Sequence, residues 1–376
     1  MDEPRHGTPP NHETPPNSET PPTPAANLDR GAGAASSIAD AGEASLDPDV
    51  RAALTGVFGA PAFVLPWIDR LLEPDELRLV AALAAVGMLT VPAAVAALGR
   101  PVSLEFFERA VRRGIIDRPT PDVVVLADFA SRLEIWTLFE GWKDLPDDVR
   151  HALADWQLAR YVDDKRPQVE ALLAGEQPQP GLENAEYLLL AEAEALIARA
   201  EHVYLWPCDC RAIMERCRKP SLVCLRFENE RGLGWEISHE RAVAVLRDAD
   251  RHGLMHTGEV GVADDQTPLI AGAICNCCAD CCFPQLAGQA LGATRLWPRA
   301  RYVAARDAAL CGGCGRCARR CPFGAFIVEP GGSSQKSAGR LPLDVAFDAE
   351  LCRGCGLCAT GCPDGAISMK ALTGPR

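Results

Sequence analysis

Between residues 74 and 129 the apolar positions change from a helical spacing to a strand-like one. The helical part divides into three segments that glycines terminate, PDELRLVAALAAVG (74–87), TVPAAVAALG (90–99) and VSLEFFERAVRRGII (102–116). Glycine near the last periodic residue is a common helix stop. After a proline-containing turn, the apolar run VVVLADF (123–129) is typical of a β-strand. The pattern therefore predicts three short helices followed by a strand.

This order of elements resembles a winged helix-turn-helix domain, which we place at residues 48–135. A domain of this kind that bound DNA through its third helix and wing would present four arginines, Arg109, Arg112, Arg113 and Arg118. Four acidic residues share the region, Glu105, Glu108, Asp117 and Asp122. Because the charge is mixed and winged helices also bind proteins, DNA is the less favoured partner. We expect this domain to dock a protein.

Leu79–Gly99 carries no charged residue and is long enough in principle to cross a bilayer. It is rich in alanine, however, and Gly87 and Pro92 interrupt it. Thr90 is placed to cap a new helix with Pro92 in its first turn. We therefore predict two packed helices and no membrane span. No basic segment leads into an apolar one at the start of the chain, so the expected location is the cytoplasm.

The other segments complete the predicted domain organisation. Residues 1–47 contain a repeated TPP motif in a polar background and are predicted to be a disordered tail. Residues 136–182 are predicted to be a helical connector, with a helix at 147–164 and the linker GEQPQPG at 175–181. Residues 183–300 alternate between helices at 183–201 and 238–252 and strands at 203–206, 222–227, 254–257 and 269–274. This alternation predicts an α/β middle domain.

The cysteine content is the most informative feature of the composition. The chain has 376 residues, 48% of them hydrophobic, and a net charge of −13, which argues against a polyanion-binding surface along the whole chain. Its 17 cysteines cannot all pair, and most lie in C-x-x-C and CC clusters after residue 207. Such usage indicates metal sites in a reducing compartment.

Eight of these cysteines belong to a repeated motif near the C-terminus. DAALCGGCGRCARRCPFGAF (307–326) recurs 41 residues later as DAELCRGCGLCATGCPDGAI (348–367), and both read C-x2-C-x2-C-x3-C-P. Three closely spaced thiolates can hold three corners of a [4Fe–4S] cube, whereas the fourth cysteine of the motif serves the other cluster. We assign one cluster to Cys311, Cys314, Cys317 and Cys362. We assign the second to Cys352, Cys355, Cys358 and Cys321.

Residues 301–376 thus resemble a bacterial two-cluster [4Fe–4S] ferredoxin domain. The resemblance implies one-electron transfer at low potential between neighbouring clusters. A zinc ribbon is disfavoured, because zinc needs four ligands and not two interlocked groups of four. The chain departs from the family pattern by inserting EPGGSSQKSAGRLP (329–342), which we interpret as a tolerated polar loop.

The middle domain contains the other nine cysteines. Eight are candidate ligands of an additional metal site, Cys208, Cys210, Cys217, Cys275, Cys277, Cys278, Cys281 and Cys282. Cys224, within an apolar strand, fits a structural cysteine better. A third iron–sulfur cluster is the leading interpretation, followed by tetrahedral zinc and by a redox dithiol. Arg211, Arg216, Arg218 and Lys219 interleave with the first group, either to offset thiolate charge or as a solvated basic face.

The CDCR and ICNCCADCC motifs, with HGLMHT between them, resemble a region that precedes ferredoxin domains in a family of iron–sulfur proteins from anaerobes and proteobacteria. The resemblance leaves the reaction open. We interpret His252 as a residue at a helix C-terminus and His256 as a polar residue on a strand edge. The chain has no GxSxG motif, no P-loop and no dinucleotide-binding fingerprint, so no catalytic motif is identified.

Together these observations predict a multidomain α+β protein with a winged-helix-like domain, a cysteine-rich α/β domain and a ferredoxin-like domain with two [4Fe–4S] clusters. The expected function is electron transfer to or from a redox partner protein, either as a carrier or as a subunit of an oxidoreductase. The alternative is a redox-responsive winged-helix transcription regulator. A regulator should carry a basic recognition face, and a gel shift at stated salt with reduced and oxidised protein separates the two hypotheses.

Overall fold

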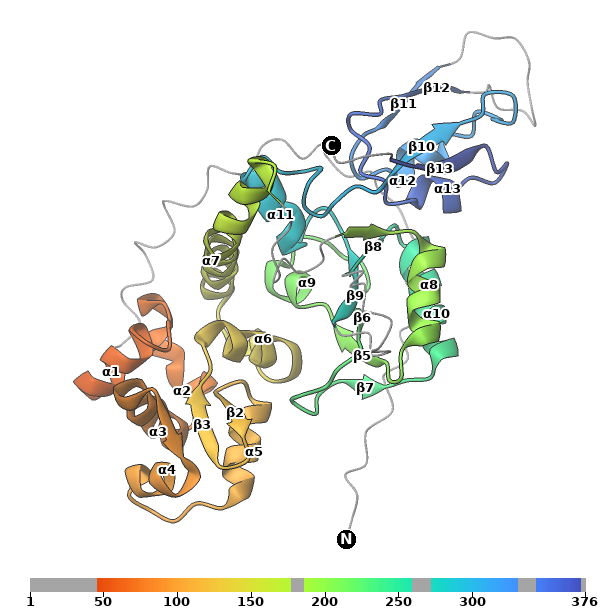
Figure 1. The fold of residues 1–376 in the computed structure, drawn as a ribbon. Coiled ribbons are helices and arrows are strands. Elements are labelled where there is room, and N and C mark those ends of the chain that lie inside the picture. The colour runs from red at the N-terminus through yellow and green to blue at the C-terminus, as the bar shows by residue number, and fades with distance from the viewer. Residues whose placement is uncertain (1–45, 177–185, 259–271, 331–342, 373–376) are drawn as a thin grey trace. The chain divides into compact units, whose positions relative to one another are not determined.

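The computed structural model describes residues 46–176, 186–258, 272–330 and 343–372. Most of the predicted tail, linker and C-terminal insertion lies outside these residues. The chain divides into two units. The N-terminal unit comprises the described residues up to Gln157 together with Arg231–Trp235, and the larger unit comprises the described residues from Leu158 to Glu230 and from Glu236 onward (Figure 1).

The N-terminal unit combines short helices with a small sheet. Its helices are α1 (Pro48–Thr55), α2 (Ile68–Leu71), α3 (Pro74–Val86), α4 (Val91–Leu98), α5 (Leu104–Arg112), α6 (Phe129–Phe139), the first half of α7 (Asp147–Leu173), and the 3-10 helices Ala62–Trp67 and Trp142–Asp144. Its strands β1 (Met88–Thr90), β2 (Ile116–Thr120) and β3 (Val123–Leu126) form an antiparallel sheet in the order β1-β3-β2. The order α3, β1, α4, α5, β2, β3 therefore pairs three helices with a three-stranded sheet.

The uncharged stretch around residue 90 breaks where its sequence predicts. The Thr90 hydroxyl accepts a hydrogen bond from the backbone N–H of Ala93 at 3.4 Å and so caps α4, which ends at Gly99 in the left-handed conformation (φ 68°). Among the described residues, no helix is long and apolar enough to cross a membrane. The strand predicted to reach Phe129 ends at Leu126, because the carboxylate of Asp128 accepts from the N–H of Ser131 at 2.8 Å and begins α6.

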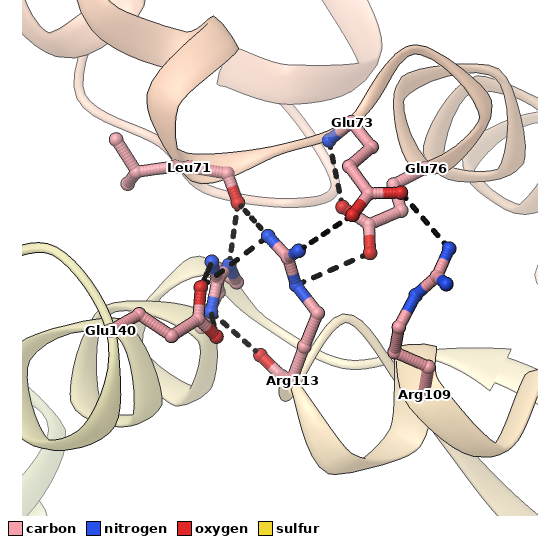
Figure 2. Close-up of polar contacts among 7 residues, drawn as sticks. Leu71, Glu73, Glu76, Arg109, Arg113 and Glu140 are labelled. Atoms are coloured by element: carbon pink, nitrogen blue, oxygen red, sulfur yellow. Dashed lines mark hydrogen bonds and ion pairs between the residues drawn. The ribbon is translucent and has the colours of Figure 1, made fainter. Parts of the chain in front are cut away.

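A buried charge network ties α3, α5 and α6 together (Figure 2). Arg132 is fully buried and donates to both carboxylate oxygens of Glu140, at 2.7 and 2.5 Å, and to the Leu71 carbonyl at 2.7 Å. Arg113 lies 3.3 Å from the buried Glu76 carboxylate and 3.5 Å from Glu140. Burial raises the pKa of Glu76, while its hydrogen bond from the backbone and the Arg113 charge oppose that shift. Arginines on α5 and α6 thus hold the unit together.

The larger unit is built around a six-stranded sheet with the order β4-β8-β9-β6-β5-β7. Its strands are β4 (Glu186–Leu188), β5 (Tyr204–Pro207), β6 (Leu222–Arg226), β7 (Trp235–Glu236), β8 (Met255–Gly258) and β9 (Ala273–Cys277). Its helices are the second half of α7, α8 (Leu190–Arg199), α9 (Asp209–Met214), α10 (His239–Arg251) and α11 (Phe283–Ala290). Helices α8 and α10 pack together, and α10 lies against β6 and β8, whereas α9 and α11 lie across the sheet from them (Figure 1).

Two predicted helices have different limits in the structure. Residues 186–188 form a strand, β4, where a helix was predicted to begin at residue 183, and α8 starts only at Leu190. Glu192 supplies the reason, because its carboxylate accepts from the N–H of Leu189 at 2.8 Å and fixes the start of the helix. Helix α7 extends to Leu173, beyond the predicted end at residue 164, and includes Pro167.

The C-terminal region, residues 302–372, is an internal repeat of a strand, a short helix and a strand. Its elements are β10 (Tyr302–Arg306), α12 (Arg316–Arg320), β11 (Phe326–Pro330), β12 (Leu343–Phe347), α13 (Leu357–Thr360) and β13 (Ile367–Ala371). The antiparallel pairs are β10–β13 and β11–β12, so each pair takes one strand from each repeat. An ion pair of 2.9 Å between Arg320 and Asp250 joins this region to α10.

Candidate metal centres

Four cysteines of the C-terminal region line one cavity. Cys352, Cys355 and Cys358 come from the second repeat, and Cys321 comes from the first. Burial raises the pKa of Cys358 to about 12, and the nearby thiols of Cys352 and Cys321 act in the same direction. The backbone N–H of Gly354 donates to Cys352 Sγ at 3.4 Å, which is the kind of contact that tunes a bound cluster. Cys321 of the first repeat lies beside the cysteines of the second because each strand pair combines one strand from each repeat.

The second set in this region lies nearer the surface. Cys317 is buried and interacts electrostatically with Cys311 and Cys314, of which Cys314 is exposed. Cys362, from the other repeat, packs against the same hydrophobic cluster as Cys317. Gly315 adopts φ 68° at the start of α12, a conformation that favours glycine and allows the sharp turn between ligands. The C-terminal region therefore contains a buried group of thiols and a more exposed group.

Six cysteines of the middle region form a closed ring of thiols, which we call the six-thiol ring. Each thiol interacts with two neighbours in the order Cys208, Cys210, Cys282, Cys277, Cys275, Cys224 and back to Cys208. Cys210 Sγ also accepts from the N–H of Phe283 at 3.5 Å, at the start of α11. Hydrogen bonds from Cys210 and Cys277 lower the pKa of Cys282 to about 7. Cys282 is therefore the thiol of the ring that ionises most readily.

Strand geometry explains how this ring forms. Alternate residues of β9 point to the same face of the sheet, so Cys275 and Cys277 share a face. The register that pairs Leu225 of β6 with Ile274 of β9 places Cys224 opposite Cys275. From the sequence, Cys224 fits a structural cysteine, because it stands alone in an apolar strand. Its place in the ring depends on strand pairing across about fifty residues, and the only local signal was its residue type.

The remaining three cysteines form a separate three-thiol group, Cys217, Cys278 and Cys281. Their sulfur atoms all lie within 4.8 Å of one another, and those of Cys217 and Cys278 are 3.7 Å apart. Among the described residues, this is the one group of three cysteine, histidine or carboxylate ligands with so close a spacing. Hydrogen bonds from Cys217 and Cys281 lower the pKa of Cys278.

Each CC pair of the ICNCCADCC motif divides between the two groups. Cys277 and Cys282 belong to the ring, whereas Cys278 and Cys281 belong to the three-thiol group. Arg211 of α9 is buried and interacts electrostatically with thiols of both groups, Cys208, Cys278 and Cys217. Burial alone would lower the pKa of Arg211, but these thiols raise it above its usual value. Of the four basic residues in this segment, Arg216 and Arg218 are exposed.

The two histidines of HGLMHT lie apart from the thiols. His252 ends α10, and its Nδ1 is 2.9 Å from the Asp248 carbonyl oxygen, as expected for a residue at a helix C-terminus. His256 is not on a strand edge, because β8 lies between β4 and β9 and buries its ring. Its Nδ1 is 2.6 Å from Asn276 Oδ1. His256 faces the side of the sheet opposite to that of Cys275 and Cys277, since strand neighbours alternate.

Tyr187 of β4 connects the six-thiol ring with the C-terminal region. It is fully buried and shares one hydrophobic cluster with Cys277 and Cys282 of the ring and with Leu357 and Cys355 of the second repeat. Its hydroxyl donates to Gln285 Oε1 at 2.8 Å. Burial first, and then the surrounding thiols, raise the pKa of Tyr187, so the phenol keeps its proton. The sequence carries no signal for Tyr187, because no cysteine lies near it in the chain.

All 17 cysteines are free thiols, and the donor set suits iron–sulfur clusters. A family model of the 4Fe-4S dicluster domain matches residues 310–367. No curated protein and no solved structure matches the chain. The C-terminal region is thus an iron–sulfur domain of the dicluster class, and this assignment supports a role in iron–sulfur electron transfer. The match does not extend to the sheet of the larger unit or to the N-terminal unit.

Proposed function

We propose that this protein transfers single electrons through two [4Fe–4S] clusters in its C-terminal region and a further iron–sulfur centre in the six-thiol ring. The observation that carries the proposal is the cavity in which Cys321 joins the three cysteines of the other repeat. Bound clusters would supply the one-electron redox chemistry. The protein acts either as a carrier or as the electron-transfer subunit of an oxidoreductase.

The proposed ligand sets follow the interlocked motif. Cys352, Cys355, Cys358 and Cys321 hold one cluster, and their common cavity supports this set. Cys311, Cys314, Cys317 and Cys362 hold the other, and the contacts of Cys317 with Cys311 and Cys314 support that set. Gly354 and Gly315 let the backbone turn tightly between ligands. The chain thus provides thiolates and backbone N–H donors.

The route of the electrons is proposed to run from the surface inward. Cys314 is exposed, so its cluster is the one that meets a partner. The cluster of Cys352 and Cys355 comes next, because Cys355 shares a hydrophobic cluster with Tyr187 and the ring cysteines. Apolar and aromatic packing excludes water along this path, which favours electron transfer over side reactions. The six-thiol ring is therefore the inner end of the relay.

A redox partner with an acidic surface fits the exposed end. Arg251, Arg316, Arg319 and Arg320 line a surface hollow together with Cys362. Arg316 and Arg319 are exposed, and the chain as a whole is acidic, with a net charge of −13. A local basic surface next to a cluster would steer an anionic partner to the exposed end of the relay, where it exchanges electrons with the protein.

We further propose that the N-terminal unit is a winged helix that docks a protein rather than DNA. Arg109 is paired with Glu73 at 3.0 Å, and Arg113 lies within 3.3 Å of Glu76 (Figure 2). Arg118 donates to the Pro121 carbonyl within its own turn. Phosphate binding would have to compete with these interactions, so the regulator hypothesis is disfavoured.

The test is a count of iron and acid-labile sulfide on anaerobically purified full-length protein, with electron paramagnetic resonance of the reduced form. Cys314→Ser should remove the iron of one C-terminal cluster and the magnetic interaction between the two. Cys224→Ser should lower iron without affecting that interaction. If iron content and spectra of the Cys314→Ser variant match those of the wild type, the proposed ligand set is wrong.

A further inference from the structure

The three-thiol group has the dimensions of a site for a single metal ion. A zinc–thiolate bond is about 2.3 Å long, so two thiolates on one tetrahedral zinc ion lie about 3.8 Å apart. The sulfur atoms of Cys217 and Cys278 are 3.7 Å apart, and Cys281 lies within 4.8 Å of both. Two thiolates that bind different irons of a cluster lie farther apart, because the iron–iron separation adds to the distance between their sulfur atoms. The spacing therefore favours one ion over a cluster.

The group is also separate from the six-thiol ring, although the two share a chain segment. In a CC pair the two side chains diverge from adjacent backbone positions, so Cys277 and Cys278 serve different groups, as do Cys281 and Cys282. None of the six ring thiols belongs to the closely spaced set. The sequence CC-x-x-CC is therefore suited to building two adjacent centres of different kinds.

Charge and access fit a bound ion. Three thiolates and one divalent ion carry a net charge of −1, and the buried cation of Arg211 lies next to Cys278 and Cys217. Cys217 is only partly buried and follows α9 in a segment without regular structure, so an ion can enter from that side. A tetrahedral ion with three protein ligands keeps one position for a small molecule, as in catalytic zinc sites.

We propose that Cys217, Cys278 and Cys281 bind one Zn²⁺ ion separately from the iron–sulfur centres and leave its fourth coordination position to a small ligand from solvent. The function of this site would differ from electron transfer, because zinc has no redox chemistry of its own and acts as a Lewis acid or as a structural ion. This proposal does not depend on the proposed function, since it concerns a metal that carries no electron.

The test is the metal content of anaerobically purified full-length protein, with zinc, iron and sulfide measured on the same sample. Wild-type protein should contain one zinc per chain, and Cys217→Ser should lower zinc at least about fivefold while iron and sulfide stay unchanged. Cys281→Ser provides a second variant in case the first fails to fold. The matched control is Cys224→Ser in the six-thiol ring, which should lower iron and leave zinc unchanged.

Cobalt substitution provides a readout of geometry. Protein loaded with Co²⁺ in place of zinc should show thiolate-to-cobalt charge transfer and the intense visible bands of a tetrahedral ion, and both should disappear in Cys217→Ser. Loss of iron instead of zinc in Cys217→Ser would assign the group to a cluster and overturn the proposal. The proposal is equally overturned if wild-type protein binds no zinc even after Zn²⁺ is added.

Discussion

Arg132 offers a sharp test of how the N-terminal unit is held together. The side chain is fully buried and donates to the carbonyls of Leu71 and Arg113 and to both oxygens of Glu140. Arg132→Met keeps most of the apolar volume but removes these four hydrogen bonds, although the Leu71 carbonyl keeps the one it accepts from Arg113 at 2.9 Å. Removing one partner of a buried ion pair costs about 3–5 kcal/mol. Because Glu140 is 28% exposed and Arg113 remains 3.5 Å away, we expect the lower end, about 3 kcal/mol.

The matched control is Arg109→Ala. Arg109 also forms an ion pair, with Glu73 at 3.0 Å, but the two side chains are 48% and 45% exposed. Exposed pairs of this kind contribute at most about 1 kcal/mol, since water and salt screen them. The two variants therefore remove the same charge from the same unit, and they differ mainly in burial.

Native-state hydrogen exchange measured by mass spectrometry reports this difference locally, without requiring the metal centres to unfold reversibly. A loss of about 3 kcal/mol corresponds to roughly a hundredfold faster exchange in peptides of α5 and α6. Arg109→Ala should change the same peptides by less than about fivefold. Equal effects of the two variants, or protected α6 amides in Arg132→Met, would refute the assignment of the network as a structural centre.

Three further predictions concern the larger unit. Tyr187→Leu should slow electron transfer between the C-terminal region and the six-thiol ring more than Tyr187→Phe, because only the leucine variant removes the aromatic ring. Flash photolysis measures both rates, and equal rates would exclude Tyr187 from the route. Reduced protein carrying Arg316→Glu and Arg319→Glu should react at least about tenfold more slowly with ferricyanide at low salt, but not with cationic hexaammineruthenium(III), if the basic surface steers partners. Burial lowers the pKa of His256 below 6.5, so the unfolded chain binds more protons than the folded chain near that pH. The contribution of neutral His256 to stability should therefore be present above pH 6.5 and lost as the pH falls below it. The melting temperature of His256→Gln should lack this fall in stability.

Local spacing made the C-terminal motif readable from sequence. The ligands of each repeat lie within about a dozen residues, so C-x2-C-x2-C-x3-C-P constrains their geometry before any tertiary structure is known. The same holds for Thr90, whose side chain bonds to the backbone three residues on. Where the structure depends on such local interactions, sequence patterns predict it.

Non-local pairing explains what the sequence did not reveal. The division of nine cysteines into two groups requires the register between β6 and β9 and the contact between the start of α11 and Cys210, neither of which is a local property. Tyr187 comes next to the thiols only because β4 pairs with β8. The burial of His256 has the same origin, since β8 becomes an internal strand only when β4 covers its edge.

Arg211 joins the two groups of the middle region in a way that no cysteine does. Its guanidinium donates to the Asn276 carbonyl at 3.0 Å and to the Pro220 carbonyl, and thiols of both groups surround it. A buried positive charge stabilises the more negative state of a nearby centre, so it makes reduction easier and also favours three thiolates on one divalent ion. One elementary charge about 4 Å away contributes on the order of 4 kcal/mol at an effective dielectric constant of about 20.

Arg211→Met should therefore lower the reduction potential of the centre in the six-thiol ring and weaken zinc binding at the three-thiol group in the same variant. The clusters of the C-terminal region should keep their potentials, because the thiols that act most strongly on Arg211 all belong to the middle region. Redox titration with electron paramagnetic resonance, together with zinc affinity from chelator competition, measures both effects. Arg218→Met, which removes an exposed charge from the same segment, is the control. If both variants leave potential and affinity unchanged, the charge of Arg211 does not act on the thiols, and its role is limited to holding the two carbonyls.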